Sequence, residues 1–208
     1  MDFQPLHYIY RPSANPEAAT LLLLHGTGGT EEDLLPLAAY FGTGINILSL
    51  RGNISENGMP RFFKRLGMGI FDEKDLEFRT NEMVAFLKEL AQKEGFDVNK
   101  IIALGYSNGA NIAGATLVLH PDFLAGAILL RPMLPFQDKK GTGNTKNAPI
   151  FLSSGSNDAT VNPNEIKKYT EQLKDSGFDV SDFVIQAGHN LSQQDLDLAA
   201  EWFKKVKL

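Results

Sequence analysis

The chain has no cysteine among its 208 residues, which excludes disulfide bonds, thiolate zinc sites and a cysteine nucleophile. Basic residues are outnumbered, because 20 Lys and Arg stand against 25 Asp and Glu and give a net charge of −5. This balance disfavours nucleic acid as a partner, since binding to phosphates needs a concentrated basic face. Long apolar runs are also lacking. The longest purely aliphatic one covers residues 21–24, whereas a membrane helix needs about 20 apolar residues.

The N-terminus and the spacing of polar residues leave out further classes of protein. Residues 1–5 have neither the basic nor the apolar region of a secretory signal, so we expect a cytoplasmic protein with no membrane partner. Asp, Glu and His do not cluster at metal-ligand spacing, and no G-x-G-x-x-G follows an expected strand. We therefore expect neither a metal nor a cofactor.

Short apolar segments alternate with longer segments of helical periodicity along the whole sequence. This alternation predicts an α/β fold in one domain over residues 1–208, with a mostly parallel sheet and helices on both of its faces. The expected strands are residues 6–11, 20–25, 45–50, 101–105, 126–130, 150–154 and 179–185. The expected helices are residues 30–41, 74–94 and 107–120, with two more that open at Asn162 and at Ser192.

Two stretches show no clear periodicity. Residues 51–71 are frequent in Gly, Asn and Pro, and we expect a long functional loop there with a short helix at residues 61–66. Residues 131–149 form the second expected loop. At this length we expect no separate lid domain.

Ser107 is the candidate nucleophile. It is the central residue of a G-x-S-x-G motif at residues 105–109, between an expected strand and an expected helix. A sharp strand-to-helix turn holds such a serine in a strained conformation with its hydroxyl pointing outward, and both flanking glycines relieve close contacts. The start of the following helix also favours negative charge nearby.

Residues 25–29 form a glycine-containing turn directly after a buried strand. Here backbone N–H groups can turn inward, so we expect the N–H groups of Thr27 and Asn108 to form an oxyanion hole. His25 lies in the same turn but precedes the nucleophile, whereas the order in α/β-hydrolases is Ser, acid, His. We therefore interpret His25 as a structural residue that holds this loop by hydrogen bonds.

Asp158 and His189 complete a candidate catalytic triad. Asp158 follows the expected strand at residues 150–154, and His189 lies between the last strand and the last helix. Of the other histidines, His7 falls in an edge strand and His120 at a helix C-terminus. In an α/β sheet these loops gather at the carboxyl ends of the strands, where a carboxylate can orient an imidazole that acts as the base.

The chain resembles the small carboxylesterase, phospholipase and acyl-protein thioesterase branch of the α/β-hydrolases. The resemblance rests on residues 22–29, on the 105–109 motif, and on the regions around Asp158 and His189. Residues 51–53 and 56–63 are similar to bacterial hydrolases linked to hydroquinone and catechol stress. The resemblance implies esterase activity on short-chain or aryl esters, often in a homodimer.

We expect Met59, Phe62 and Phe63 to line an apolar, open pocket, with packing of the aromatic rings onto the core as the alternative. The leading hypothesis is a serine carboxylesterase acting through an acyl-enzyme on Ser107. The alternatives are an acyl thioesterase, a hydrolase of lactones or carbon–carbon bonds in aromatic breakdown products, and a non-catalytic binder of small molecules.

Overall fold

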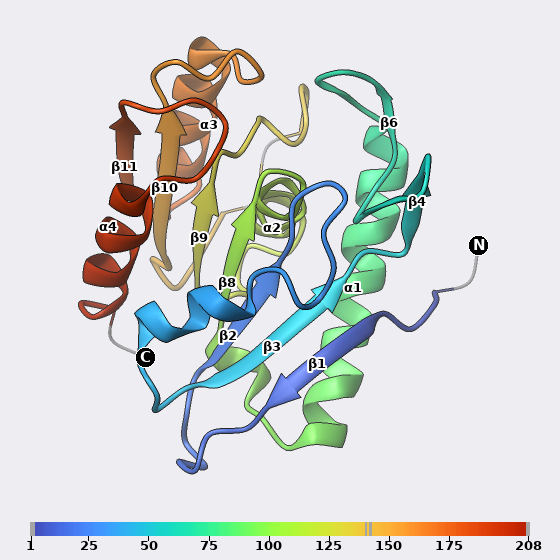
Figure 1. Cartoon of the computed structure of the whole chain (residues 1–208), viewed down its shortest axis with the longest axis vertical. Coiled ribbons are helices and arrows are strands. Elements are labelled where there is room, and N and C mark those ends of the chain that lie inside the picture. The colour runs from blue at the N-terminus through green and yellow to red at the C-terminus, as the bar shows by residue number, and fades with distance from the viewer. Residues whose placement is uncertain (1–2, 140, 142, 207–208) are drawn as a thin grey trace.

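The computed structural model describes residues 3–139, 141 and 143–206, and a seven-stranded sheet runs through it (Figure 1). The strand order is β1-β3-β2-β8-β9-β10-β11. Only β1 is antiparallel, to β3, and every other pair in this sheet is parallel. The strands are β1 (His7–Arg11), β2 (Thr20–Leu24), β3 (Asn46–Arg51), β8 (Ile101–Tyr106), β9 (Gly126–Leu130), β10 (Pro149–Gly155) and β11 (Asp179–Ile185).

Helices cover both faces of the sheet, as the alternating pattern predicts (Figure 1). One face carries α1 (Glu73–Glu94), α2 (Asn108–Leu119) and α3 (Pro163–Asp175), and the other carries η1 (Leu35–Phe41) and α4 (Gln193–Phe203). Successive side chains of a strand point to opposite faces. Leu22 and Leu24 of β2 therefore pack in the core beneath the first group of helices, and Leu21 and Leu23 pack in the core beneath the second.

Residues 51–71 differ from the sequence prediction. They form two hairpins, of β4 (Ile54–Glu56) with β5 (Met59–Arg61) and of β6 (Arg65–Gly67) with β7 (Ile70–Phe71), and the helix expected at residues 61–66 is wrong. Asn57 and Gly58 both have positive φ, 52° and 82°, which is the conformation of a tight two-residue hairpin turn. The Asn-Gly pair is the feature of the sequence that could have predicted the first hairpin.

The helix expected at residues 30–41 is also wrong in its first half. Residues 31–34 form turns, and only η1, a 3-10 helix, follows. Its cap residue Leu34 makes no side-chain cap hydrogen bond, and a proline occupies the first turn. That proline is Pro36, which is well suited to the first turn of a helix but not to its interior, so the helical segment begins beside it, at Leu35.

The remaining helices begin and end where the capping residues predict. Asn162 accepts from the Asn164 N–H at the start of α3, and Ser192 forms a capping box with Asp195 at the start of α4. Gly95 ends α1 in the left-handed conformation. A short 3-10 helix, η2 (Val98–Lys100), leads into β8. Within the described residues, no helix combines the length and the apolar character needed to cross a membrane.

Candidate active site

Ser107 occupies the turn between β8 and α2 with φ 51° and ψ −111°, a strained conformation for a residue other than glycine. Its N–H donates to Leu130 O at 2.9 Å, which ties the turn to β9. A Cβ at Gly105 would lie 2.4 Å from Gly109 O, and one at Gly109 would lie 2.0 Å from Leu24 O. Both positions therefore require glycine, as the motif predicts.

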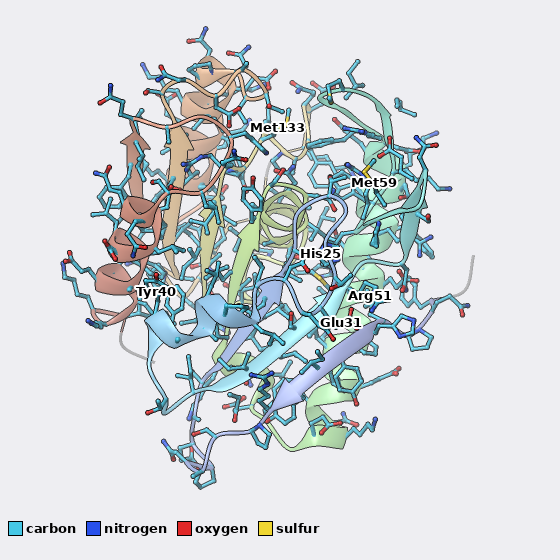
Figure 2. The ribbon with its side chains drawn as sticks, in the orientation of Figure 1. His25, Glu31, Tyr40, Arg51, Met59 and Met133 are labelled. Carbon is cyan, nitrogen blue, oxygen red and sulfur yellow. The ribbon has the colours of Figure 1, made fainter. Side chains whose placement is uncertain are left out.

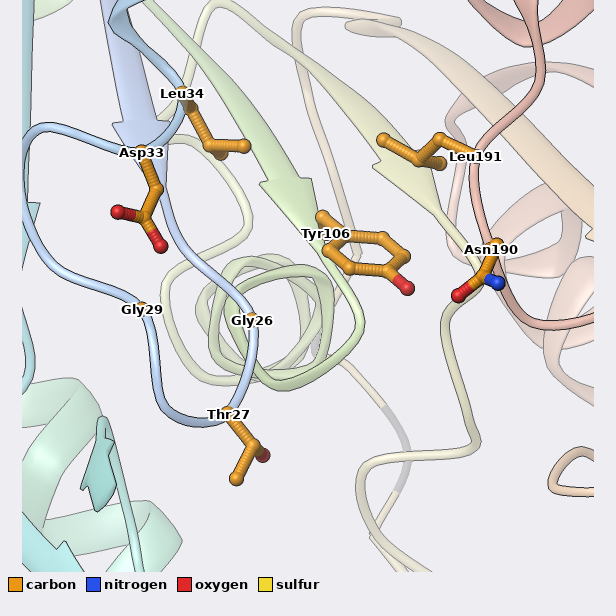
Figure 3. Close-up of a pocket in the computed structure, with 8 residues that line it drawn as sticks. All are labelled: Gly26, Thr27, Gly29, Asp33, Leu34, Tyr106, Asn190 and Leu191. Atoms are coloured by element: carbon orange, nitrogen blue, oxygen red, sulfur yellow. The ribbon is translucent and has the colours of Figure 1, made fainter. Parts of the chain in front are cut away.

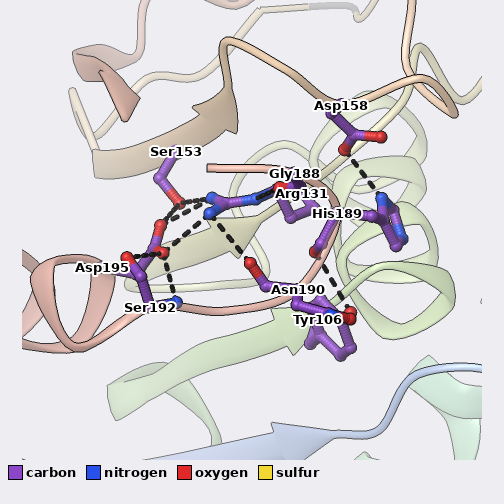
Figure 4. Close-up of polar contacts among 9 residues, drawn as sticks. All are labelled: Tyr106, Arg131, Ser153, Asp158, Gly188, His189, Asn190, Ser192 and Asp195. Carbon is purple, nitrogen blue, oxygen red and sulfur yellow. Dashed lines mark hydrogen bonds and ion pairs between the residues drawn. The ribbon is translucent and has the colours of Figure 1, made fainter. Parts of the chain in front are cut away.

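His189 lies between Ser107 and Asp158 in the structure. Its Nε2 is 2.8 Å from Ser107 Oγ. Its Nδ1 is 2.7 Å from Asp158 Oδ2 (Figure 4). The carboxylate accepts from Nδ1–H, which leaves Nε2 free to accept the serine proton. The Asp158 side chain is 1% exposed and also accepts from the Thr160 N–H at 2.8 Å, so the acid is fixed while the imidazole, 27% exposed, is open to solvent.

The two residues expected to form the oxyanion hole are both held by residues 60–62. Arg61 Nη1 donates to Thr27 Oγ1 at 2.6 Å, and the Phe62 N–H donates to Asn108 Oδ1 at 2.7 Å. The Gly28 N–H donates to Pro60 O at 2.9 Å. Asn108 is the first residue of α2, where backbone N–H groups have no acceptor within the helix. The β5 hairpin therefore bridges the glycine turn and the nucleophile turn.

His25 is buried beneath this region, 1% exposed, and its two ring nitrogens have partners. Nδ1 is 2.6 Å from Gly26 O, and Nε2 accepts from the Gly52 N–H at 3.1 Å. Glu31 and Arg51, labelled with His25 in Figure 2, are near enough to the imidazole to act on it electrostatically. Burial is the main cause that lowers the pKa of the imidazole. These contacts support the structural role predicted for His25.

Phe62 and Phe63 do not line an open pocket, and this part of the prediction is wrong. Phe62 is 2% exposed, and its ring centroid lies 4.7 Å from that of His25 in a tilted arrangement. Phe63 is fully buried, and its ring centroid lies 5.0 Å from that of Phe71. Packing the hairpin segment onto the core buries both rings. Met59, 39% exposed, lies against Gly28 instead, and its place in substrate binding stays a prediction.

A depression of about 340 Å³ lies directly beside the glycine turn (Figure 3). It extends from Thr27 toward Tyr106, which precedes the nucleophile, and Asn190, which follows the candidate base. The lining residues are Gly26, Thr27, Gly29, Asp33, Leu34, Tyr106, Asn190 and Leu191. A larger depression of about 570 Å³ runs along α3 and β11. None of the three triad candidates lines either depression, but the smaller one includes Thr27 and the chain neighbours of Ser107 and His189.

Two buried arginines were missed by the sequence analysis. Arg61 holds Thr27, as described above, and Arg131 forms an ion pair with Asp195 in which both side chains are 0% exposed. Each contacts residues far away in the sequence. Arg61 lies in the 56–63 string that resembles bacterial hydrolases, but no function was predicted for it, and Arg131 belongs to no motif. Within the described residues, no group of three or more His, Asp or Glu side chains could hold a metal ion.

Comparison with known proteins identifies the class to which this fold and site belong. The sequence matches the family described as Phospholipase/Carboxylesterase over residues 8–207, so the chain belongs to that family and its sheet has the α/β-hydrolase fold. The chain is thus a hydrolase of the carboxylesterase type, and the family resemblance drawn from the motifs is confirmed.

Individual relatives cover nearly the full chain. It is 44% identical over 186 residues to "Putative hydrolase MhqD" of Bacillus subtilis (strain 168), covering 89% of this chain and 92% of that protein. A crystal structure of Bacillus cereus carboxylesterase matches with a TM-score of 0.94 at 40% identity, covering 97% of this chain and 95% of the other. A structure of YahD with malic acid matches with a TM-score of 0.91 at 32% identity, covering 97% and 100%.

Proposed function

We propose that this chain is a serine carboxylesterase that hydrolyses small carboxylic esters, short-chain or aryl, through an acyl-enzyme on Ser107. The observation that supports it best is the continuous pair of hydrogen bonds from Ser107 Oγ through His189 to Asp158, at 2.8 and 2.7 Å. Each distance falls within the hydrogen-bond reach that a nucleophile, its base and an orienting acid need.

In the first half of the reaction, Ser107 Oγ forms a bond to the ester carbonyl carbon while His189 Nε2 takes the hydroxyl proton. The carbonyl oxygen becomes an oxyanion that the N–H groups of Thr27 and Asn108 would stabilise. The bond to the alcohol oxygen then breaks, and His189 gives its proton to the departing alcohol. Asp158 keeps the imidazole in the required tautomer and stabilises its charged form.

In the second half, a water molecule attacks the acyl-enzyme. His189 accepts a proton from this water, the bond to Ser107 Oγ breaks, and the proton returns to the serine as the carboxylic acid leaves. The depression beside Thr27, about 340 Å³, is at the small end of the range for ligand pockets. We propose that the acyl group occupies this depression, whose volume fits a short acyl or single-ring group.

The experiment is a panel of alkyl, aryl and thiol esters and aromatic lactones, combined with labelling by a serine-directed fluorophosphonate. We expect hydrolysis of short-chain or aryl esters, and we expect Ser107→Ala to lower kcat by a factor of about 10⁴ or more. Ser107→Ala also removes the label. Ser55→Ala, at an exposed serine of β4, is the matched control that keeps both the label and the activity.

The panel also separates the alternatives. A clear preference for thioesters or lactones would replace the proposed substrate class while keeping the same nucleophile. A wild-type protein that neither hydrolyses any member nor takes the label at neutral pH would contradict the proposal and favour a binding protein.

A further inference from the structure

His189 lies in an irregular link between β11 and α4, so the position of its imidazole depends on how that link is held. Two of the backbone carbonyls there accept from other parts of the site. Ala187 O accepts from the Asn157 N–H at 3.0 Å, and His189 O accepts from the Tyr106 hydroxyl at 3.2 Å. The link is therefore tied to the acid loop and to the nucleophile turn.

Arg131 holds the two carbonyls on either side of His189. Its Nε donates to Gly188 O at 3.0 Å, and its Nη2 donates to Asn190 O at 3.3 Å (Figure 4). Together with the two contacts above, four consecutive carbonyls, of residues 187–190, each accept a hydrogen bond. A single guanidinium thus clamps the backbone from both sides of the candidate base.

The guanidinium is itself fixed. Nη1 and Nη2 donate to the two Asp195 carboxylate oxygens at 2.6 and 2.7 Å, and Nη1 also donates to Ser153 Oγ at 3.0 Å. All five N–H groups of Arg131 therefore have acceptors, which no other side chain could reproduce. Asp195 is held in turn by the Ser192 N–H and hydroxyl, both at 2.8 Å.

Placing this pair in the interior has a cost. Both side chains are 0% exposed, and desolvation makes a buried ion pair no more stabilising than a well-packed apolar pair of similar volume. Arg131 also has φ 56°, in the left-handed region that non-glycine residues seldom adopt. Strained residues of this kind cluster at functional sites, where the surrounding structure holds them in place.

We propose that Arg131, fixed by Asp195, is a positioning residue that keeps His189 Nε2 at hydrogen-bonding distance from Ser107 Oγ. The inference rests on the proposed function, since it assigns Arg131 a part in the action of His189. Arg131 acts through the backbone of residues 188 and 190 and through no contact with the reacting atoms.

The test compares Arg131→Met and Arg131→Lys with the wild type in steady-state hydrolysis of the best ester, at a temperature where circular dichroism shows each variant folded. We expect Arg131→Met to lower kcat about a hundredfold with KM within about twofold, because a small misplacement of the base weakens the chemical step and not the binding. We expect Arg131→Lys to fall between, because its ammonium has three donors instead of five.

Proton NMR supplies a readout that a merely structural role would not move. The His189 Nδ1–H in its hydrogen bond to Asp158 should give a downfield signal. We expect the signal to broaden or vanish in Arg131→Met and to return in part in Arg131→Lys, while the far-ultraviolet circular dichroism stays that of the wild type.

Removing the charge of Arg131 leaves the charge of Asp195 buried and unpaired, so the Arg131→Met variant alone is prone to unfold. The double variant Arg131→Met/Asp195→Asn removes both charges, and its amide oxygen can still accept from the Ser192 N–H. It should show the same loss of kcat. Arg79→Met is the matched control, because Arg79 pairs with Asp75 and Glu82 on α1, and its loss should leave kcat unchanged.

Folded Arg131→Met or double variant with wild-type kcat and an unchanged downfield signal would overturn the inference and leave the proposed function standing. A wild-type protein with no hydrolysis and no phosphonate label would overturn the proposed function, and the inference with it.

Discussion

Gly109 lies where a side chain has no room, since a Cβ there would be 2.0 Å from Leu24 O and 2.7 Å from His25 O. Both atoms belong to the backbone, and neither can rotate away. We expect Gly109→Ala to lower the free energy of unfolding by about 3 kcal/mol, because the added methyl group would push the start of α2 away from the end of β2. Urea unfolding measures the change.

Gly44→Ala is the control for this prediction. A Cβ at Gly44 would meet nothing within 4 Å, so the free energy of unfolding should change by no more than about 0.5 kcal/mol. Equal midpoints for the two variants would show that the nucleophile turn relaxes to admit a methyl group.

The positions of some site residues could be predicted from the sequence, and those of others could not. Ser107, Asp158 and His189 lie together as expected, because chain order and the carboxyl ends of parallel strands decide where their loops meet. Arg61 and Arg131 gave no such signal. Their hydrogen bonds to Thr27 and Gly188 span 34 and 57 positions of the chain, and contacts of this kind leave no periodic pattern in the sequence.

At the scale of elements, α1 shows how a helix end is specified. Gly95 ends its 22 residues with φ 79°, and its N–H donates to Ala91 O at 2.9 Å. A Cβ at Gly95 would contact nothing within 4 Å, so only the backbone conformation disfavours a side chain there. We expect Gly95→Ala to lower the free energy of unfolding by about 1 kcal/mol.

Gly95→Asn separates conformation from contact, because asparagine adopts the left-handed conformation more readily than alanine. Thermal unfolding should therefore place the asparagine variant between the wild type and the alanine variant. If asparagine were as damaging as alanine, the conformational explanation would be wrong.

Helices and strands with a strong hydrophobic periodicity or clear capping residues could be predicted from the sequence. Elements that lack both features could not. The seven strands of the sheet and the long helix α1 match their expected ranges to within two residues, because solid apolar runs and a repeated helical face leave few alternatives. The hairpins of residues 54–71 have strands of two or three residues, too short for an alternating pattern to appear. Pro36 prevents a helix from running from residue 30 through to residue 41, because a proline in a helix interior removes a backbone hydrogen bond and clashes with the preceding turn.

For the molecule as a whole, His25 links stability to pH. Burial lowers its pKa in the folded state, first among the causes, whereas the unfolded chain has the ordinary value of 6.5. Below that value the unfolded state takes up a proton that the folded state refuses, so the free energy of unfolding falls as pH falls from 6.5 toward the lowered pKa. His120, whose pKa is also lowered by burial, adds to the effect.

We expect chemical denaturation to show a decrease in the free energy of unfolding between pH 7 and pH 5. The decrease should be smaller in His25→Gln, whose amide does not titrate, even though that variant starts from a lower value at pH 7. His120→Gln should also reduce the pH-dependent decrease, because it removes the contribution of the second histidine. A slope in His25→Gln identical to that of the wild type would contradict the assignment.

Asp195 serves two neighbours at once, since the same carboxylate caps α4 and holds Arg131. Fraying of the first turn of α4 would therefore release the guanidinium together with the cap. On heating, loss of activity and amide exchange at the start of α4 should therefore set in together, at a temperature below that of global unfolding. This helix end would then limit the temperature at which the site keeps its structure.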